Sequence, residues 1–249
     1  GVVNFGAASI ADTDTLNVNG ILGGYATVGG ADWAINSTAA ADAPITAYTG
    51  YTDIAATGST IADGAASNVR LNSAGGGGSI ALGAATTTIN TLLQNTTTAA
   101  TVNNAGGTLR LGATGGVLLP AAAQSLTIGT APDSGTLTAG GADNTAGEVI
   151  LINNSANAVT VNSVVADNGS GIVSLTKAGS GSATLAGNNT HTGTNIVASG
   201  TLNVSADSNF GTIPGAATPS QIVLNGGTLN ATTSFTLDAN RGMFLGAVG

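Results

Sequence analysis

The sequence predicts an all-β protein, specifically a parallel β-helix (β-solenoid) with irregular loops. Short runs of alternating apolar and polar residues recur roughly every ten residues, and none is long enough for a helix. Turn residues separate the runs, and the 249 residues include 39 glycines. Asn-Gly hairpin signals occur at residues 19–20, 168–169 and 225–226, which is sparse for an antiparallel sandwich. Stacked coils that bury one continuous core explain this pattern better.

Taken in order, the chain begins with short strands expected at residues 2–5 and 15–18. The composition changes at about residues 23–67, where all three tyrosines and the single tryptophan occur. We predict a loop-rich or protruding stretch there. Regular strands are then expected at residues 68–71, 79–82, 88–93, 101–102, 108–111, 117–119, 125–128, 136–138, 148–152, 158–161 and 171–175, with several more up to residue 245. At ~20 residues per coil, the chain would make roughly a dozen coils.

The whole chain, residues 1–249, is predicted to be a single β-solenoid segment of a larger protein. The first residues contain no Met and no basic or hydrophobic region of a signal peptide. The last residues follow directly on a strand-like run at residues 243–245. Both ends resemble cuts, so we expect a fragment or a processed product.

Residues 175–205 read LTKAGSGSATLAGNNTHTGTNIVASGTLNVS and resemble the passenger-associated repeat of bacterial autotransporter adhesins. The positions that fit the family pattern are Lys177, Gly179, Gly187, Asn189, Thr190, Thr192, Gly193, Gly200, Thr201 and Leu202. His191 departs from the pattern where Tyr or Phe is usual, and Ala183 where a larger apolar residue is common. Residues 222–246 resemble the segment that often follows, so the resemblance covers about residues 175–246. It implies a right-handed parallel β-helical passenger that is exported to the bacterial cell surface.

Composition excludes several classes of function. Only 6% of the residues are charged, against about 25% in an ordinary domain, and the formal net charge is −8 with four basic residues. Four scattered cations cannot follow a phosphate backbone, so we expect no nucleic-acid partner. No apolar run reaches the ~18 residues that a spanning helix needs, so we expect no membrane insertion of this segment.

The sequence carries no recognisable catalytic or metal-binding constellation. His191 is the only histidine, and we expect it to be a structural stacking residue. There is no cysteine, and most of the twelve acidic residues lie apart from one another in loops. Asp-containing fragments at residues 12–14, 29–32 and 140–143 do not repeat as a calcium-binding nonapeptide does. We therefore expect no enzyme activity, no bound metal and no cofactor.

Four aromatic residues are the best candidates for ligand binding. Tyr25, Trp33, Tyr48 and Tyr51 fall together in the predicted protrusion. Exposed aromatic faces stack on sugars or anchor a neighbouring protein. The alternative, which we favour, is that these side chains plug the first coils or pin the long loop.

Together, these observations predict a structural protein that is extracellular or lies at the cell surface. We expect the β-helical stalk of an adhesin-like or filament-forming protein exported to the bacterial outer membrane. Uncapped coil ends and low charge favour self-association, end to end or laterally. A surface glycan or a neighbouring cell is a further expected partner. The alternative is a β-helical protein that binds or cleaves polysaccharide, which requires carboxylates that face one groove for the cleavage reaction.

Overall fold

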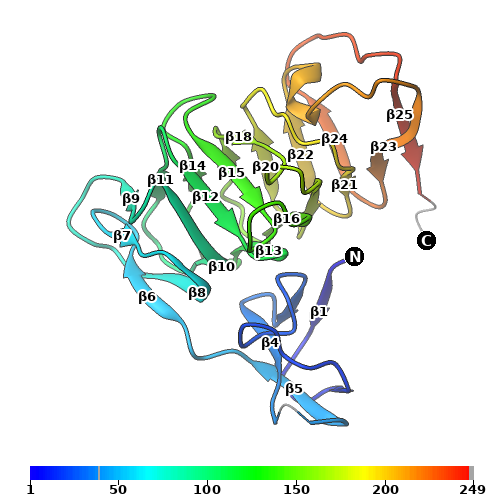
Figure 1. Cartoon of the computed structure of the whole chain (residues 1–249). Coiled ribbons are helices and arrows are strands. Elements are labelled where there is room, and N and C mark those ends of the chain that lie inside the picture. The colour runs from blue at the N-terminus through cyan, green and yellow to red at the C-terminus, as the bar shows by residue number, and fades with distance from the viewer. Residues whose placement is uncertain (39, 247–249) are drawn as a thin grey trace.

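The computed structural model describes residues 1–38 and 40–246 as an all-β protein whose helical content is one 3-10 turn, η1 (Asp207–Phe210). A long β-solenoid makes up most of the chain, as the sequence predicts (Figure 1). A small separate sheet from the N-terminus lies against the side of the solenoid. No helix in the described part of the chain is long and apolar enough to cross a membrane.

The small sheet, which we call the N-terminal sheet, has five strands in the order β1-β3-β4-β5-β2. Its strands are β1 (Val3–Phe5), β2 (Asp12–Thr13), β3 (Ala26–Val28), β4 (Asp32–Asn36) and β5 (Ala43–Ala47). β1 and β3 are parallel, and the other pairs are antiparallel. The sheet has a small apolar core of its own, around Ala26, Val28 and Ile45. The protrusion expected at about residues 23–67 overlaps this sheet but has different boundaries, because residues 52–67 already belong to the first coils.

The solenoid has three faces, and all of its strand pairs are parallel. The first face consists of β6 (Thr52–Ala55), β8 (Gly64–Ser73), the second half of β10 (Thr86–Gln94), β13 (Thr114–Leu119), β16 (Gly147–Asn153), β19 (Val173–Ala178), β21 (Asn195–Val197), β23 (Thr218–Leu224) and β25 (Arg241–Leu245). The second face consists of β7 (Thr60–Ile61), β9 (Ile80–Leu82), β11 (Ala100–Asn103), β14 (Leu126–Ile128), β17 (Val159–Val161), β20 (Ser182–Leu185), β22 (Thr201–Val204) and β24 (Thr228–Ala231). The short third face consists of the first half of β10 with β12 (Thr108–Leu111), β15 (Thr136–Ala139) and β18 (Val164–Val165).

The first face contains nine strands, so fewer coils form than the dozen expected. One reason is that residues 1–47 do not join the stack. Coil length also varies with the loops: the coil that runs from Lys177 to its partner Val197 is short, whereas the coil from Val117 to Leu151 is much longer. The expected ~20 residues per coil therefore hold only where the loops are shortest, as between Lys177 and Val197.

The core is a set of columns in which similar side chains stack from coil to coil. On the first face, Leu92, Val117 and Leu151 occupy one inward column and are fully buried. On the second face, Val102, Ile128 and Val161 do the same. Fully burying an aliphatic side chain stabilises the fold by about 1.5–3 kcal/mol, so a thin core of aliphatic residues is sufficient when it repeats along the whole stack.

Candidate functional site

Trp33, the most prominent of the four aromatic candidates, is fully buried between the N-terminal sheet and the first face of the solenoid. It packs in a cluster with Leu93, Leu118 and Ile150, whose side chains point outward from the first face. A Cβ atom on Gly116 would lie 2.5 Å from Trp33 Cη2, so only glycine leaves space for the indole ring. Trp33 thus joins the two sheets, and its faces are not open to a ligand.

Tyr48 and Tyr51 lie where the chain passes from β5 to β6, with their rings edge to face at a centroid distance of 4.9 Å. Tyr51 Oη accepts a hydrogen bond from the backbone N–H of Trp33 at 3.1 Å and donates one to Asp32 at 3.2 Å. The Arg70 guanidinium lies 4.4 Å from the centre of the Tyr51 ring. Burial, more than any other cause, raises the pKa of Tyr51 above its ordinary value.

These contacts agree with the interpretation that the aromatic residues pin the long loop to the first coils. Tyr25, Tyr48 and Tyr51 are half-buried and belong to the same cluster as Trp33. Ligand binding by the four residues stays a prediction, and only the three tyrosines keep exposed surface for it.

The segment that carries the family resemblance spans two adjacent coils. β19 and β20 belong to the first of these coils, and β21 and β22 to the next. Gly179 and Gly200 follow the first-face strands and have φ angles of 76° and 67°. A side chain at either position would also strike a backbone carbonyl of the neighbouring coil. The glycines of the motif therefore allow the corners of successive coils to stack closely.

Lys177 occupies an inward column of the core, between Leu151 and Val197, and is fully buried. Its Nζ donates hydrogen bonds to the carbonyl oxygens of Ala178, Gly179 and Ser199, at 2.5, 2.9 and 3.2 Å. Burial lowers the pKa of Lys177 to about 8. The motif lysine thus acts as an internal donor that joins the corners of two successive coils.

His191 and several asparagines of the repeat also point inward and form a buried polar network. His191 Nε2 lies 3.0 Å from Asn195 Oδ1, and Asn195 Nδ2 donates to the Phe210 carbonyl at 2.9 Å. Asn189 Oδ1 accepts from the Val165 N–H at 2.8 Å. Burial lowers the pKa of His191. The histidine, which we expected to have a structural role, is thus a buried part of the coil.

Residues 222–246 attach to the repeat by the pairing of β23 with β21 and of β24 with β22, and one ion pair links them to η1. Arg241 is buried, and its Nε lies 2.9 Å from Asp207 Oδ1 in η1. The same guanidinium donates to the carbonyls of Phe210, Gly211 and Thr212. The pair thus fastens the last strand of the first face to the corner formed by η1.

Several carboxylates each bind a partner on a neighbouring coil, and none of these shares its partner with a second carboxylate. Asp53 pairs with Arg70 at 2.7 Å, and this hydrogen bond lowers the pKa of the carboxyl. Asp63 accepts from the Thr88 N–H at 2.7 Å, and Asp167 accepts from the Thr192 hydroxyl at 2.7 Å. Among residues 1–38 and 40–246, no three His, Cys, Asp or Glu side chains gather as a metal site would require. Asp53, Asp63 and Asp167 thus link neighbouring coils.

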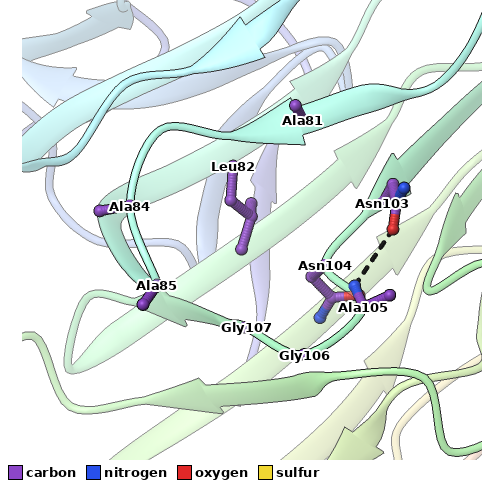
Figure 2. Close-up of a pocket in the computed structure, with 9 residues that line it drawn as sticks. All are labelled: Ala81, Leu82, Ala84, Ala85, Asn103, Asn104, Ala105, Gly106 and Gly107. Carbon is purple, nitrogen blue, oxygen red and sulfur yellow. Dashed lines mark hydrogen bonds between the residues drawn. The ribbon is translucent and has the colours of Figure 1, made fainter.

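A pocket of about 380 Å³ lies at the corner between the second and third faces (Figure 2). It is lined by Ala81, Leu82, Ala84, Ala85, Asn103, Asn104, Ala105, Gly106 and Gly107. Asn103 is already bonded to the Ala105 N–H at 3.1 Å. No acid, base or nucleophile lines this pocket, so its lining residues supply no catalytic chemistry.

Comparison with known families identifies the same stretch that the motif analysis singles out. Residues 175–204 match the family model of the passenger-associated-transport-repeat. The match confirms the resemblance over these residues and does not extend to residues 205–246. Searches of curated proteins and of solved structures found no match. The chain thus carries a passenger-associated transport repeat folded into a parallel β-solenoid, a combination that fits an autotransporter passenger.

Proposed function

We propose that this chain is a non-catalytic stalk in the passenger of an exported bacterial surface protein, and that copies of it join end to end. The observation that carries the proposal is that the transport repeat is built into the continuous solenoid, with Lys177 and His191 inside the stack. A segment whose motif residues are committed to packing serves as a stiff spacer.

A non-catalytic role is supported by how the chain uses its polar groups. Asp53, Asp143 and Asp207 form ion pairs with arginines, and Asp133 accepts from the Asn188 amide at 2.7 Å. The pocket of Figure 2 has no titratable side chain. Cleavage of polysaccharide by two carboxylates in one groove therefore has less support.

End-to-end association is supported by the two ends of the stack, which lie at opposite ends of the molecule (Figure 1). In the described residues, β25 pairs only with β23, and β6 pairs only with β8. Met243 and Leu245 continue inward columns of the core but are 42% and 68% exposed. An apolar strand edge of this kind accepts a further coil, either from polypeptide that continues the same chain, as in one stretch of a monomeric passenger, or from the β6 end of a second copy. Only the second contact, which joins unlike ends head to tail, produces open filaments.

The proposal is tested by charging the exposed end. We expect the wild-type protein to form concentration-dependent oligomers in analytical ultracentrifugation and rods in electron microscopy. Leu245→Lys should remain monomeric, because a buried unpaired ammonium is unfavourable in the joint. Ile172→Lys is the matched control, since Ile172 is 56% exposed and directly precedes β19, a strand that is paired on both sides. A wild-type protein that stays monomeric at high concentration would reject end-to-end joining but leave the stalk role to be judged separately.

Export to the cell surface is tested on the intact source organism. Protease treatment of whole cells should remove the segment, and antibodies against it should label the cells without permeabilisation. Labelling that requires permeabilised cells would contradict the proposed location.

A further inference from the structure

The edge of the N-terminal sheet formed by β1 has no neighbouring strand in the described part of the chain. The Val3 N–H donates to the Tyr25 carbonyl, and the Phe5 carbonyl accepts from the Gly29 N–H. In a parallel ladder, alternate residues bond to the neighbouring strand. The N–H and C=O groups of Val2 and Asn4 therefore point toward the open edge.

The first face carries an apolar stripe on its outer side, near Ile152, Ala178 and Ala198, which lie against β1. Ile196, Val223 and Phe244 lie in register on adjacent strands of the first face, with their side chains on its outer side. Ile196 and Val223 are partly exposed, and Phe244 is 55% exposed. The three residues form a stripe across β21, β23 and β25.

The stripe extends an interface that the molecule already uses. The same outer side of the first face, at Leu118, Ile150 and Ile152, is covered by Trp33 and Ile21 from the N-terminal region. Val2 from the edge of the N-terminal sheet also packs in this cluster. The N-terminal sheet thus covers the first face up to β1, and the stripe lies beyond it.

A groove of about 240 Å³ joins the open edge to the solenoid wall. It is lined by Val2, Asn4, Thr27, Ile152, Asn154, Ala178, Gly179, Ala198 and Ser199, none of which is charged. Lys177 lies beneath it, but its ammonium is buried and bonded to carbonyls. The groove therefore offers hydrogen-bonding backbone on one side and small, uncharged side chains on the other.

We propose that β1 and the stripe together form a β-augmentation site for an extended, uncharged strand of another polypeptide. The strand pairs with the backbone of Val2 and Asn4, and its alternate side chains are apolar and cover Ile196 and Val223. Two separate features fit this one occupant: the unpaired edge accepts a backbone in extended form, and the stripe accepts apolar side chains from one face of that strand. The absence of charge in the lining disfavours charged peptides.

The probe is a fluorescent, blocked peptide with the sequence Thr-Val-Thr-Val-Thr-Val, and its matched counterpart carries an N-methyl group on every residue, so that pairing with β1 is blocked in either strand orientation. Binding is measured by fluorescence anisotropy. We expect the wild-type protein to bind the first peptide and to bind the N-methylated peptide at least about tenfold more weakly, since backbone bonding is lost. Equal binding of the two peptides, or no binding of the first at about 1 mM, overturns the proposal.

Two variants and a control locate the site on the protein. Val2→Pro removes an N–H from the open edge without removing a β1–β3 hydrogen bond, and Val223→Asp places a charge in the stripe. Each should weaken binding about tenfold or more. Thr160→Asp, on the outer side of the second face, should bind as the wild type does. Circular dichroism confirms that each variant is folded. If the variants bind equally well, the site lies elsewhere; if Val2→Pro instead abolishes self-association, the occupant is a second copy of this chain and the proposal is wrong.

Discussion

Lys177 shows how a single polar residue is accommodated in a thin apolar core. Its column contains Leu151 on one side and Val197 on the other, yet its Nζ meets three backbone carbonyls. Corner carbonyls need donors, and the lysine reaches them from inside the stack. The residue is therefore a structural part of the corner, although lysine is almost never fully buried unless it is paired.

Lys177 should make the stability of the protein depend on pH. Its pKa is lowered from 10.5 to about 8 in the folded state. Above about pH 8 the folded protein loses this proton while the unfolded chain still holds it, so the free energy of unfolding rises with pH up to about 10. Below about pH 8 both states are protonated, and the full unfavourable effect of burying the charge remains. Urea unfolding from about pH 7 to about pH 9.5 should show this rise in the wild type and not in Lys177→Met. Parallel pH profiles for the two proteins would contradict it.

Gly116 should be required for docking of the N-terminal sheet. A Cβ atom there would lie 2.5 Å from Trp33 Cη2 and 2.7 Å from the Gly24 carbonyl oxygen. Because one neighbour is backbone, the clash cannot be relieved by a side-chain rotation, and we expect Gly116→Ala to loosen residues 1–47. Limited proteolysis should then cleave near the β5–β6 connection faster than in the wild type. Gly76→Ala, at a position with no atom within 4 Å, is the control and should leave the cleavage rate unchanged.

At the scale of elements, the two arginine pairs at opposite ends of the solenoid differ in environment. Arg241 is buried against η1, and its guanidinium also bonds to the carbonyls of Phe210, Gly211 and Thr212. Arg70 pairs with Asp53 at the surface of β6 and β8, where solvent screens the charges. The first pair connects a strand to a corner, whereas the second joins two neighbouring strands.

Removing Arg241 should therefore have a much larger effect than removing Arg70. Arg241→Met leaves the Asp207 carboxylate without its cation and should cost about 3–5 kcal/mol in the stability of the last coils. Arg70→Met should cost about 1 kcal/mol or less. Hydrogen exchange at residues 205–212 and 241–245 measures the first effect, and exchange at residues 52–55 measures the second. Similar losses for both variants would show that burial does not determine the strength of these pairs.

For the whole molecule, stability should vary along the solenoid axis. Each coil contacts only its neighbours, so opening can begin at either end and spread inward. The terminal strands β6 and β25 each pair on one side only, whereas β13, β16 and β19 pair on both. We expect the slowest amide exchange in β16 and faster exchange toward both ends, as measured by mass spectrometry. Uniform exchange along the stack would indicate that the solenoid opens as one cooperative unit.

The strand pattern and the solenoid class follow from local sequence. Runs such as residues 148–152 and 88–93 alternate or are apolar, lie between turn residues, and form strands β16 and β10. Short strands of this kind cannot be stable alone, so stacking is the simplest way for them to bury their apolar sides. The repeat at residues 175–204 could be identified for the same reason, because its glycines and asparagines occupy corners whose geometry permits few residue types.

Only the tertiary structure decided where the remaining polar and aromatic groups lie. Nothing in the sequence places Lys177 and His191 inside the coil, because their partners are carbonyls and amides that distant parts of the chain supply. Trp33 is buried because residues 1–47 fold back onto the first face, a contact between segments far apart in sequence. The coils also differ in length, as between Val117 and Leu151 and between Lys177 and Val197, so the register between stacked strands cannot be read from the sequence. Local patterns determine which residues form strands, whereas stacking across loops of unequal length determines which residues meet.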